Sequence, residues 1–165
     1  MNNTKVRICF VCTGNICRSP LAEAVLRDEL QRRGISERFE VDSAGTHAHH
    51  TGEESDSRMR RVASAHGVNI RHRARQFRDS EAAAFDYVLA MDTGHERALK
   101  RQVRGDAAGE NITMFRNFDS ETDDTDYPDV PDPWYGNLAG FERVFEMVSR
   151  TCLEFADHLE RAHSD

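Results

Sequence analysis

Short apolar segments alternate with longer segments of helical periodicity along this chain. The segments expected to form strands are 5–12, 39–45, 85–92 and 111–115. Those expected to form helices are 19–34, 55–67, 93–103 and 139–162. Strands that alternate with helices build parallel β-α-β units, and the helices then cover both faces of one sheet. The pattern therefore predicts a three-layer, doubly wound α/β fold of the flavodoxin-like kind, with a four-stranded parallel sheet.

Size and composition indicate a single domain over residues 1–165. A chain of 165 residues, 38% of them hydrophobic, suits one core. The formal net charge of −7 argues against binding to nucleic acid or to an anionic membrane, so any bound anion needs a local site. The chain shows neither a run of about 20 apolar residues nor a signal peptide. We therefore expect a cytoplasmic protein whose four cysteines stay reduced.

Several residues have the character of helix ends. Within the expected helix 19–34, Ser19 suits the N-cap, Pro20 suits the first helical position and Gly34 suits the stop. Asp92 precedes another expected helix and is predicted to cap it.

The loop VCTGNICRSP (11–20), which leaves the first strand and enters the first helix, has the residues of an anion site. Folds of this class bind ligands beyond the carboxyl ends of their strands. A helix N-terminus there exposes unpaired N–H groups and the positive end of a dipole. Gly14 and Asn15 tolerate backbone conformations that turn N–H groups inward, and Arg18 adds a planar fork of donors. We predict a cradle for phosphate or a similar dianion.

Cys12 stands at the base of this predicted cradle. Thiols ionise more readily at helix N-termini and beside cations, so we expect Cys12 to be a thiolate that attacks the phosphorus of a bound ester. The simpler alternative is a buried core cysteine followed by a capped helix. That alternative leaves Cys17 and Arg18 without a purpose.

The segment VCTGNICRSPLAE (11–23) resembles the phosphate loop of the low-molecular-weight protein tyrosine phosphatases. The resemblance extends through most of the chain, in the same order as in that family. It includes the segments DSAGTHAHHTGEESDSRM (42–59), AHGVNIRHRARQF (65–77), FDYVLAMD (85–92) and VPDPWYG (130–136). It implies an enzyme that hydrolyses phosphotyrosine in proteins through a cysteinyl-phosphate intermediate.

The resemblance also implies a role for individual residues. Cys12 would be the nucleophile, Arg18 would hold the phosphate, and Asp132 would serve as general acid and then as general base. The implied phosphate-binding residues are Thr13, Gly14, Asn15, Ile16, Cys17, Arg18 and Ser19. The implied walls of the pocket are His49, Trp134 and Tyr135. The implied supporting network consists of Asn15, Ser19, Ser43 and His72.

No cofactor and no metal ion are implied by the resemblance. The implied partners are phosphotyrosine-containing proteins and a cognate tyrosine kinase, with inorganic phosphate as the product, and the chain is expected to be a monomer. Many family members have an aromatic residue where this chain has His49, which leaves the preference among phosphotyrosine sequences open.

Three rival functions remain for comparison. Thr13 also occurs in members that resemble protein-arginine phosphatases, although the Trp134–Tyr135 pair favours a phenyl ring. An arsenate reductase on the same fold needs two further cysteines close in sequence, and after residue 18 this chain has only Cys152. A non-catalytic module that docks phosphoproteins would not need nucleophile, guanidinium and acid together.

Two further cysteine patterns were considered. Cys17 lies five residues after Cys12 on a tight loop, and we predict that it is a redox partner which forms a disulfide with an oxidised Cys12. Cys9 and Cys12 form a C-x-x-C pattern, but residues three apart on a strand face opposite sides of the sheet. A metal or thioredoxin-like site at Cys9 is therefore not expected.

Overall fold

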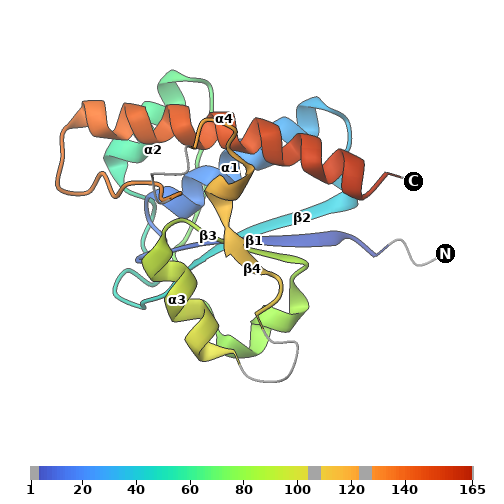
Figure 1. Ribbon diagram of the computed structural model, residues 1–165. Helices are drawn as coiled ribbons and strands as arrows, with labels where there is room; N and C mark the ends of the chain where they lie inside the picture. The colour runs from blue at the N-terminus through green and yellow to red at the C-terminus, as the bar shows by residue number, and fades with distance from the viewer. Residues whose placement is uncertain (1–3, 104–108, 123–127, 165) are drawn as a thin grey trace.

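A parallel sheet of four strands forms the centre of the molecule. The computed structural model describes residues 4–103, 109–122 and 128–164. The strands are β1 (Val6–Cys12), β2 (Phe39–Gly45), β3 (Tyr87–Ala90) and β4 (Ile112–Met114). They run in parallel in the order β2-β1-β3-β4 (Figure 1). The predicted four-stranded parallel sheet is confirmed.

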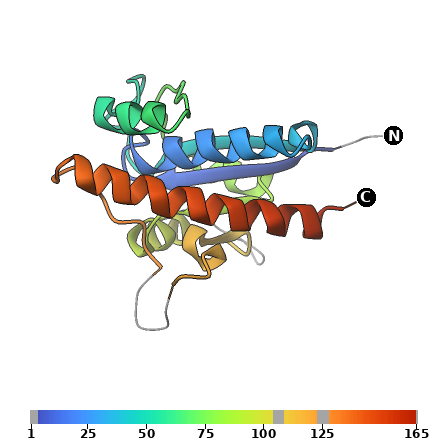
Figure 2. The same ribbon diagram turned by 90° about the horizontal axis from the view of Figure 1, so that it is seen from above.

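Helices cover both faces of this sheet. The helices are α1 (Arg18–Arg32), α2 (Ser57–Ala65), α3 (Thr93–Gln102) and α4 (Leu138–Ala162). In Figure 1, α1, α2 and α4 lie above the sheet and α3 lies below it, and Figure 2 shows α1 and α4 running side by side. Short 3-10 turns occupy Ser36–Arg38, Asp79–Ala84 and Phe115–Phe118. The predicted three-layer arrangement is therefore confirmed.

The core is divided by the sheet into two apolar clusters. Alternate residues of β1 point to opposite faces, as the pleat of a strand requires. Phe10 and Cys12 belong to the larger cluster with α1, α2 and α4. Cys9 and Val11 belong to the smaller cluster, which includes Leu99 of α3. Cys9 and Cys12 thus face opposite sides of the sheet, as predicted.

The start of α1 differs from the prediction. The helix begins at Arg18, and the N-cap position belongs to Cys17, whose side chain makes no capping hydrogen bond. Ser19 therefore lies inside the first turn, and the prediction that it is the N-cap is wrong. At the other end, Gly34 has φ 73°, a conformation that suits glycine, directly after the last turn.

Strand β2 matches the expected range 39–45, and the remaining elements apart from α4 are slightly shorter than expected. Helix α2 begins at Ser57 because the Asp56 carboxylate accepts hydrogen bonds from the backbone N–H groups of Arg58 and Met59. Strand β4 ends at Met114, where a 3-10 turn begins. Helix α4 matches the expected range within one residue. Among the described residues, no helix is both long enough and apolar enough to cross a membrane.

The order of the strands creates a crevice at their carboxyl ends. β1 has β2 on one side and β3 on the other. The chain continues from β1 into α1 above the sheet and from β3 into α3 below it (Figure 1). The loops that leave β1 and β3 therefore lead to opposite faces of the sheet. The crevice between two such loops is where open α/β sheets bind ligands.

Candidate active site

Asn15 organises the loop between β1 and α1. It is the only described residue other than glycine with a positive φ, at 58°. Its side-chain amide is fully buried and donates to the hydroxyl oxygens of Ser19, at 2.9 Å, and Ser43, at 3.0 Å. Its side-chain carbonyl accepts the backbone N–H of Arg75 at 2.9 Å. These hydrogen bonds connect the loop to α1, to β2 and to the backbone of Arg75, and they hold the loop in its curved shape.

Ser19 contacts the thiol of Cys12 instead of capping α1. The Ser19 hydroxyl lies 2.9 Å from Cys12 Sγ. The hydroxyl oxygen accepts from the Asn15 amide, and the hydroxyl proton can be donated to the sulfur or, over a longer distance of 3.4 Å, to the Ala44 carbonyl. Cys12 itself is only 3% exposed, so this contact is made in a largely dry environment.

His72 supports the loop from behind. Its Nε2 lies 2.9 Å from both the backbone and the side-chain oxygen of Asn15, which is the geometry of a shared N–H donor. Burial lowers the pKa of His72, so the ring is neutral near pH 7. Its Nδ1 lies 3.9 Å from the carboxylate of Glu23, a buried acid whose pKa is raised to about 7 by its burial. Ser43 and His72 thus lie behind the loop and do not line the pocket.

Arg18 is held rigidly by residues from two distant loops. It is 4% exposed, and its Nη1 donates to Asp92 Oδ2 at 2.9 Å and to the Val130 carbonyl at 3.0 Å. Its Nη2 lies 3.8 Å from Asp132 Oδ2. The guanidinium therefore has its orientation set by Asp92, while Asp132 is close to it without a tight contact.

Asp92 has two functions, one at each carboxylate oxygen. Oδ1 accepts the backbone N–H of His95 at 2.9 Å and so caps α3, as the sequence predicted. Oδ2 holds Arg18. The sequence indicated only the first function, because the partner of the second lies 74 residues away along the chain.

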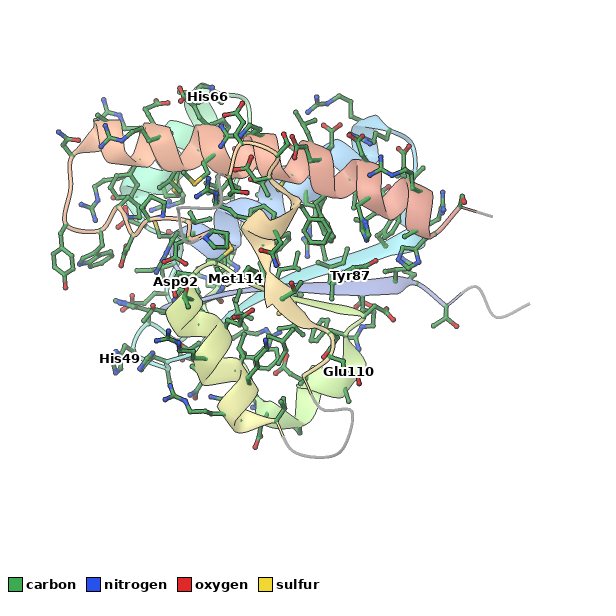
Figure 3. All side chains as sticks on the ribbon, viewed as in Figure 1. His49, His66, Tyr87, Asp92, Glu110 and Met114 are labelled. Atoms are coloured by element: carbon green, nitrogen blue, oxygen red, sulfur yellow. The ribbon has the colours of Figure 1, made fainter. Side chains whose placement is uncertain are left out.

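A pocket of about 170 Å³ opens above the loop. Its lining comprises Cys12, Thr13, Gly14, Ile16, Cys17, Arg18, His49, His50, Asp132, Trp134 and Tyr135. The structure thus brings together the predicted nucleophile, guanidinium, acid and pocket walls. Figure 3 labels His49 and Asp92 at the end of the molecule opposite the two chain termini.

The aromatic wall is exposed but anchored. Tyr135 is 93% exposed and Trp134 is 36% exposed. The Arg58 guanidinium lies 5.3 Å from the centre of the Trp134 ring and donates to the Trp134 carbonyl at 3.0 Å. The Asp132 carboxylate accepts the backbone N–H of Trp134 at 3.1 Å. These contacts connect Asp132 and Trp134 to Arg58 at the N-terminal end of α2.

Two histidines near the loop were not recognised in the sequence. His50 lines the pocket, with its ring 5.8 Å from that of Trp134 and its Nδ1 2.6 Å from the Glu53 carboxylate. His95 on α3 places Nε2 2.7 Å from the Thr13 hydroxyl. The position of His95 three residues after the capping Asp92 was the one local signal that could have identified it.

Cys17 lines the pocket while being almost fully buried. Burial raises the pKa of its thiol strongly, and the neighbouring Cys12 adds to the effect. Burial also raises the pKa of Cys9 and of Cys152 well above the ordinary value.

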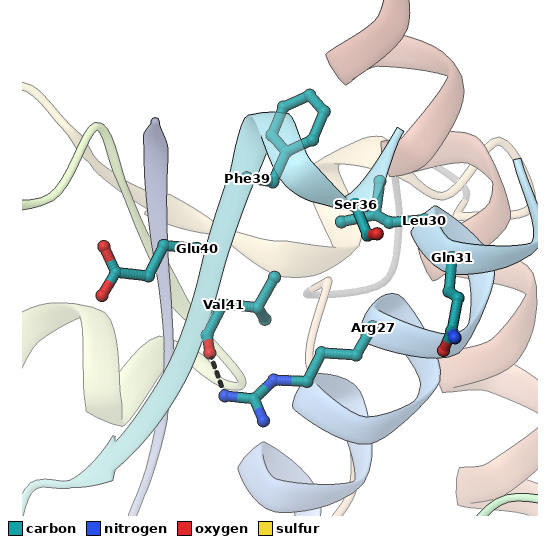
Figure 4. Close-up of a pocket in the computed structure, with 7 residues that line it drawn as sticks. All are labelled: Arg27, Leu30, Gln31, Ser36, Phe39, Glu40 and Val41. Atoms are coloured by element: carbon teal, nitrogen blue, oxygen red, sulfur yellow. Dashed lines mark hydrogen bonds between the residues drawn. The ribbon is translucent and has the colours of Figure 1, made fainter. Parts of the chain in front are cut away.

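Another hollow, of about 300 Å³, lies between α1 and β2 (Figure 4). Its lining has no thiol and no residue of the 12–19 loop. The Arg27 guanidinium donates to the Val41 carbonyl there, which occupies an acceptor on the outer edge of β2. The hollow is not a candidate active site.

The structure is a doubly wound α/β protein in which Cys12 and Arg18 lie close together at the position where such sheets bind ligands. Comparison with known proteins agrees. The sequence model of the family described as "Low molecular weight phosphotyrosine protein phosphatase" matches residues 7–165. This chain belongs to that family.

Individual relatives cover nearly the same length. The chain is 46% identical over 142 residues to a low molecular weight protein-tyrosine-phosphatase of Streptomyces coelicolor, covering 86% of each. It is 39% identical over 159 residues to the human low molecular weight phosphotyrosine protein phosphatase, covering 94% of this chain and 95% of the human protein. A crystal structure of a protein tyrosine phosphatase from Entamoeba histolytica, with Hepes in its active site, superposes with a TM-score of 0.89 at 34% identity, covering 96% of this chain and 99% of that one.

Proposed function

We propose that this chain hydrolyses phosphotyrosine in proteins through a covalent cysteinyl-phosphate. The observation that carries the proposal is the contact of 2.9 Å between Cys12 Sγ and Ser19 Oγ, in a pocket that also contains Arg18 and Asp132. Family membership supports the phosphatase activity.

In the first step, the Cys12 thiolate attacks the phosphorus of the bound ester. A bond forms between sulfur and phosphorus, and the bond from phosphorus to the tyrosine oxygen breaks. Arg18 and the backbone N–H groups of the loop stabilise the equatorial oxygens. Asp132, protonated at this stage, gives its proton to the departing phenolate, whose conjugate acid has a pKa near 10. Trp134 and Tyr135 contact the phenyl ring.

In the second step, water attacks the phosphorus and Asp132 accepts one of its protons. The bond between phosphorus and sulfur breaks, and inorganic phosphate leaves. The Ser19 hydroxyl donates to the departing sulfur, which makes the thiolate a better leaving group. The contact of 2.9 Å between Ser19 Oγ and Cys12 Sγ supports this role, because it is shorter than the 3.4 Å from the same hydroxyl to the Ala44 carbonyl.

The substrate partners proposed are proteins phosphorylated on tyrosine by a cognate kinase, and the proposed active form is a monomer. A protein that only docks phosphoproteins would not need Asp132 close to Arg18. The arsenate reductase alternative requires a second and third reactive thiol beyond Cys12. Cys152 is fully buried on α4 and does not line the pocket, which argues against such a relay.

Hydrolysis of para-nitrophenyl phosphate and of a phosphotyrosine peptide in the presence of chelator tests the proposal. We expect turnover by the parent chain and its loss in Cys12→Ser, with phosphate still bound by the variant because the cradle is mostly backbone and Arg18. Cys152→Ser, which changes a buried thiol remote from the pocket, is the matched control and should keep its activity. Full activity of Cys12→Ser would refute the covalent mechanism, and a parent chain that hydrolyses neither substrate would refute the function.

A further inference from the structure

A hollow that the proposed mechanism does not use is lined mainly by arginine. It has a volume of about 400 Å³, and its lining comprises Glu54, Arg60, Ile70, Arg71, His72 and Arg73. We call it the arginine hollow. Because burial lowers the pKa of His72, its ring is neutral near pH 7. Three arginines against one glutamate then give the lining an excess of positive charge, in a chain whose formal net charge is −7.

The charges of the arginine hollow are only partly paired with one another. The Glu54 carboxylate lies between two of the arginines, 3.3 Å from Arg60 Nη1 and 3.7 Å from Arg73 Nη2. Both distances exceed the roughly 2.7–2.9 Å of a charge-assisted hydrogen bond. Arg71 is exposed and forms no ion pair with any residue in the described part of the chain. The hollow thus has donors that its own residues leave free, and Glu54 shows that a carboxylate fits between them.

One short segment connects the arginine hollow to the active-site pocket. His49 and His50 line the pocket, and Glu54 lines the hollow. Because His50 and Glu54 are four positions apart, their Cα atoms are separated by at most about 14 Å. The backbone N–H of Glu53 donates to the His50 carbonyl at 2.9 Å, so the chain turns there and the separation is shorter. An extended peptide covers such a distance in about four residues.

We propose that the arginine hollow is a docking site for acidic side chains of the substrate protein, about three to five residues away from its phosphotyrosine. The proposal rests on the phosphatase function proposed above and adds a preference for acidic substrate sequences to it. The planar guanidinium of arginine matches a carboxylate with two parallel N–H donors. An exposed ion pair changes affinity by about 1.4- to 5-fold. The hollow therefore affects the choice of substrate and takes no part in the chemistry.

A solvated cationic face without a ligand is the simpler alternative. The two differ in a measurable way because the whole molecule is acidic. Its long-range field disfavours an acidic peptide. A preference for acidic peptides therefore requires a local site, whereas a merely solvated face would give no preference or the opposite one.

Peptides that differ in a single residue test the proposal. One phosphotyrosine peptide is made with glutamate or with glutamine at each position, out to about six residues on either side of the phosphotyrosine. The measured quantity is the ratio of kcat/KM for the glutamate form to that for the glutamine form, so a general change in activity cancels. We expect a ratio of about 2 to 5 at the best position and a ratio near 1 beside the phosphotyrosine. Salt should lower the ratio because it screens exposed charges.

Variants of two lining residues locate the effect. The side chains of the other two arginines also donate to backbone carbonyls, whereas that of Arg71 makes no hydrogen bond within the described residues. Arg71 can therefore be replaced with little disturbance of the fold. Arg71→Gln should lower the ratio about 2-fold, and Arg71→Glu should bring it below 1. Glu54→Gln removes the carboxylate that competes with the peptide and should raise the ratio about 2-fold.

Arg61→Gln is the matched control. Arg61 is an exposed arginine of α2 outside the lining of the hollow, so this variant removes the same charge and should leave the ratio unchanged. A parental ratio of 1 at every position, or equal losses in Arg61→Gln and Arg71→Gln, would overturn this inference while parental activity on phosphotyrosine peptides still supports the proposed function. A parent that hydrolyses no phosphotyrosine peptide would refute the proposed function and this inference with it.

Discussion

Asp132 and Asp92 both approach Arg18, but their environments suit different tasks. The Asp92 side chain is 25% exposed and bonds Arg18 at 2.9 Å, whereas that of Asp132 is 48% exposed and stays 3.8 Å away. A carboxyl that exchanges a proton with substrate and water needs such access. Asp92 is therefore a structural partner of Arg18, and Asp132 is the candidate acid and base.

The role of Asp132 predicts a dependence on the leaving group. Asp132→Asn should slow phosphotyrosine hydrolysis by about 10²–10⁴-fold, the usual contribution of a positioned proton donor. The loss should shrink for esters of strongly acidic phenols, whose phenolates leave without protonation. A series of substituted phenyl phosphates measures this trend. An equal loss for every leaving group would mean that Asp132 serves only to hold Trp134 and the loop.

Cys17 offers a second reaction at the same pocket. A thiolate at Cys12, which lines the pocket, would be oxidised by peroxide to a sulfenic acid, and attack by the Cys17 thiol would release water and form a disulfide. We expect dithiothreitol to restore the peroxide-treated parent. Cys17→Ser should be active but recover far less after the same treatment, with Cys9→Ser as the control on the other face of the sheet. Equal recovery, with no Cys12–Cys17 linkage in mass spectra, would assign Cys17 to packing alone.

At the scale of elements, the end of β2 presses directly against the loop of the active site. A Cβ added at Gly45 would lie 2.6 Å from the backbone oxygen of Thr13 and 3.1 Å from the backbone nitrogen of Asn15. Backbone atoms cannot move aside as a flexible side chain can. The shape of the loop thus depends on the absence of a side chain at the last residue of a neighbouring strand.

Gly45→Ala should therefore impair catalysis. We expect kcat/KM to fall at least about 10-fold, because displacement of a catalytic group by 1 Å can cost about 100-fold, together with a lower melting temperature. Gly140→Ala in the first turn of α4, where the nearest contacts are at 4.0 Å, is the matched control and should retain parental activity. If Gly45→Ala matched the parent in rate, the close approach of β2 would have no part in shaping the loop.

The element boundaries show how far local patterns reach. The helix stop at Gly34 and the cap at Asp92 were predictable because each depends on residues within a few positions. The start of α1 was predicted wrongly. Serine is a common N-cap residue, but the Ser19 hydroxyl instead contacts the Cys12 sulfur and accepts a hydrogen bond from Asn15. The geometry of the loop decides which of its possible partners the Ser19 side chain contacts. Local sequence preferences carry no information about that geometry.

In the acidic segment before Asp132, too, contacts with residues distant in sequence decide the environment of individual side chains. The acidic composition of residues 119–129 is typical of a solvated loop, and residues 123–127 lie outside the described residues. Asp119 is instead 2% exposed and pairs with Arg116 and Arg150, which hold its pKa at about 2 although its burial opposes this. Asp129 accepts the backbone N–H of Thr93 at the start of α3.

At the scale of the whole molecule, the sequence by itself determined the class of fold and the loop from Cys12 to Ser19. Hydrophobic periodicity decides which segments become strands and helices, and the order of these segments allows few sheets. The proposed nucleophile Cys12 and the guanidinium of Arg18 lie only six residues apart, so their proximity follows from chain connectivity. Tertiary structure alone decided which groups surround them: Asp92 beside Arg18, His72 behind Asn15, His95 at Thr13. These partners are 57 to 82 residues apart along the chain, and they meet because the strand order β2-β1-β3-β4 brings the ends of separate strands to one crevice.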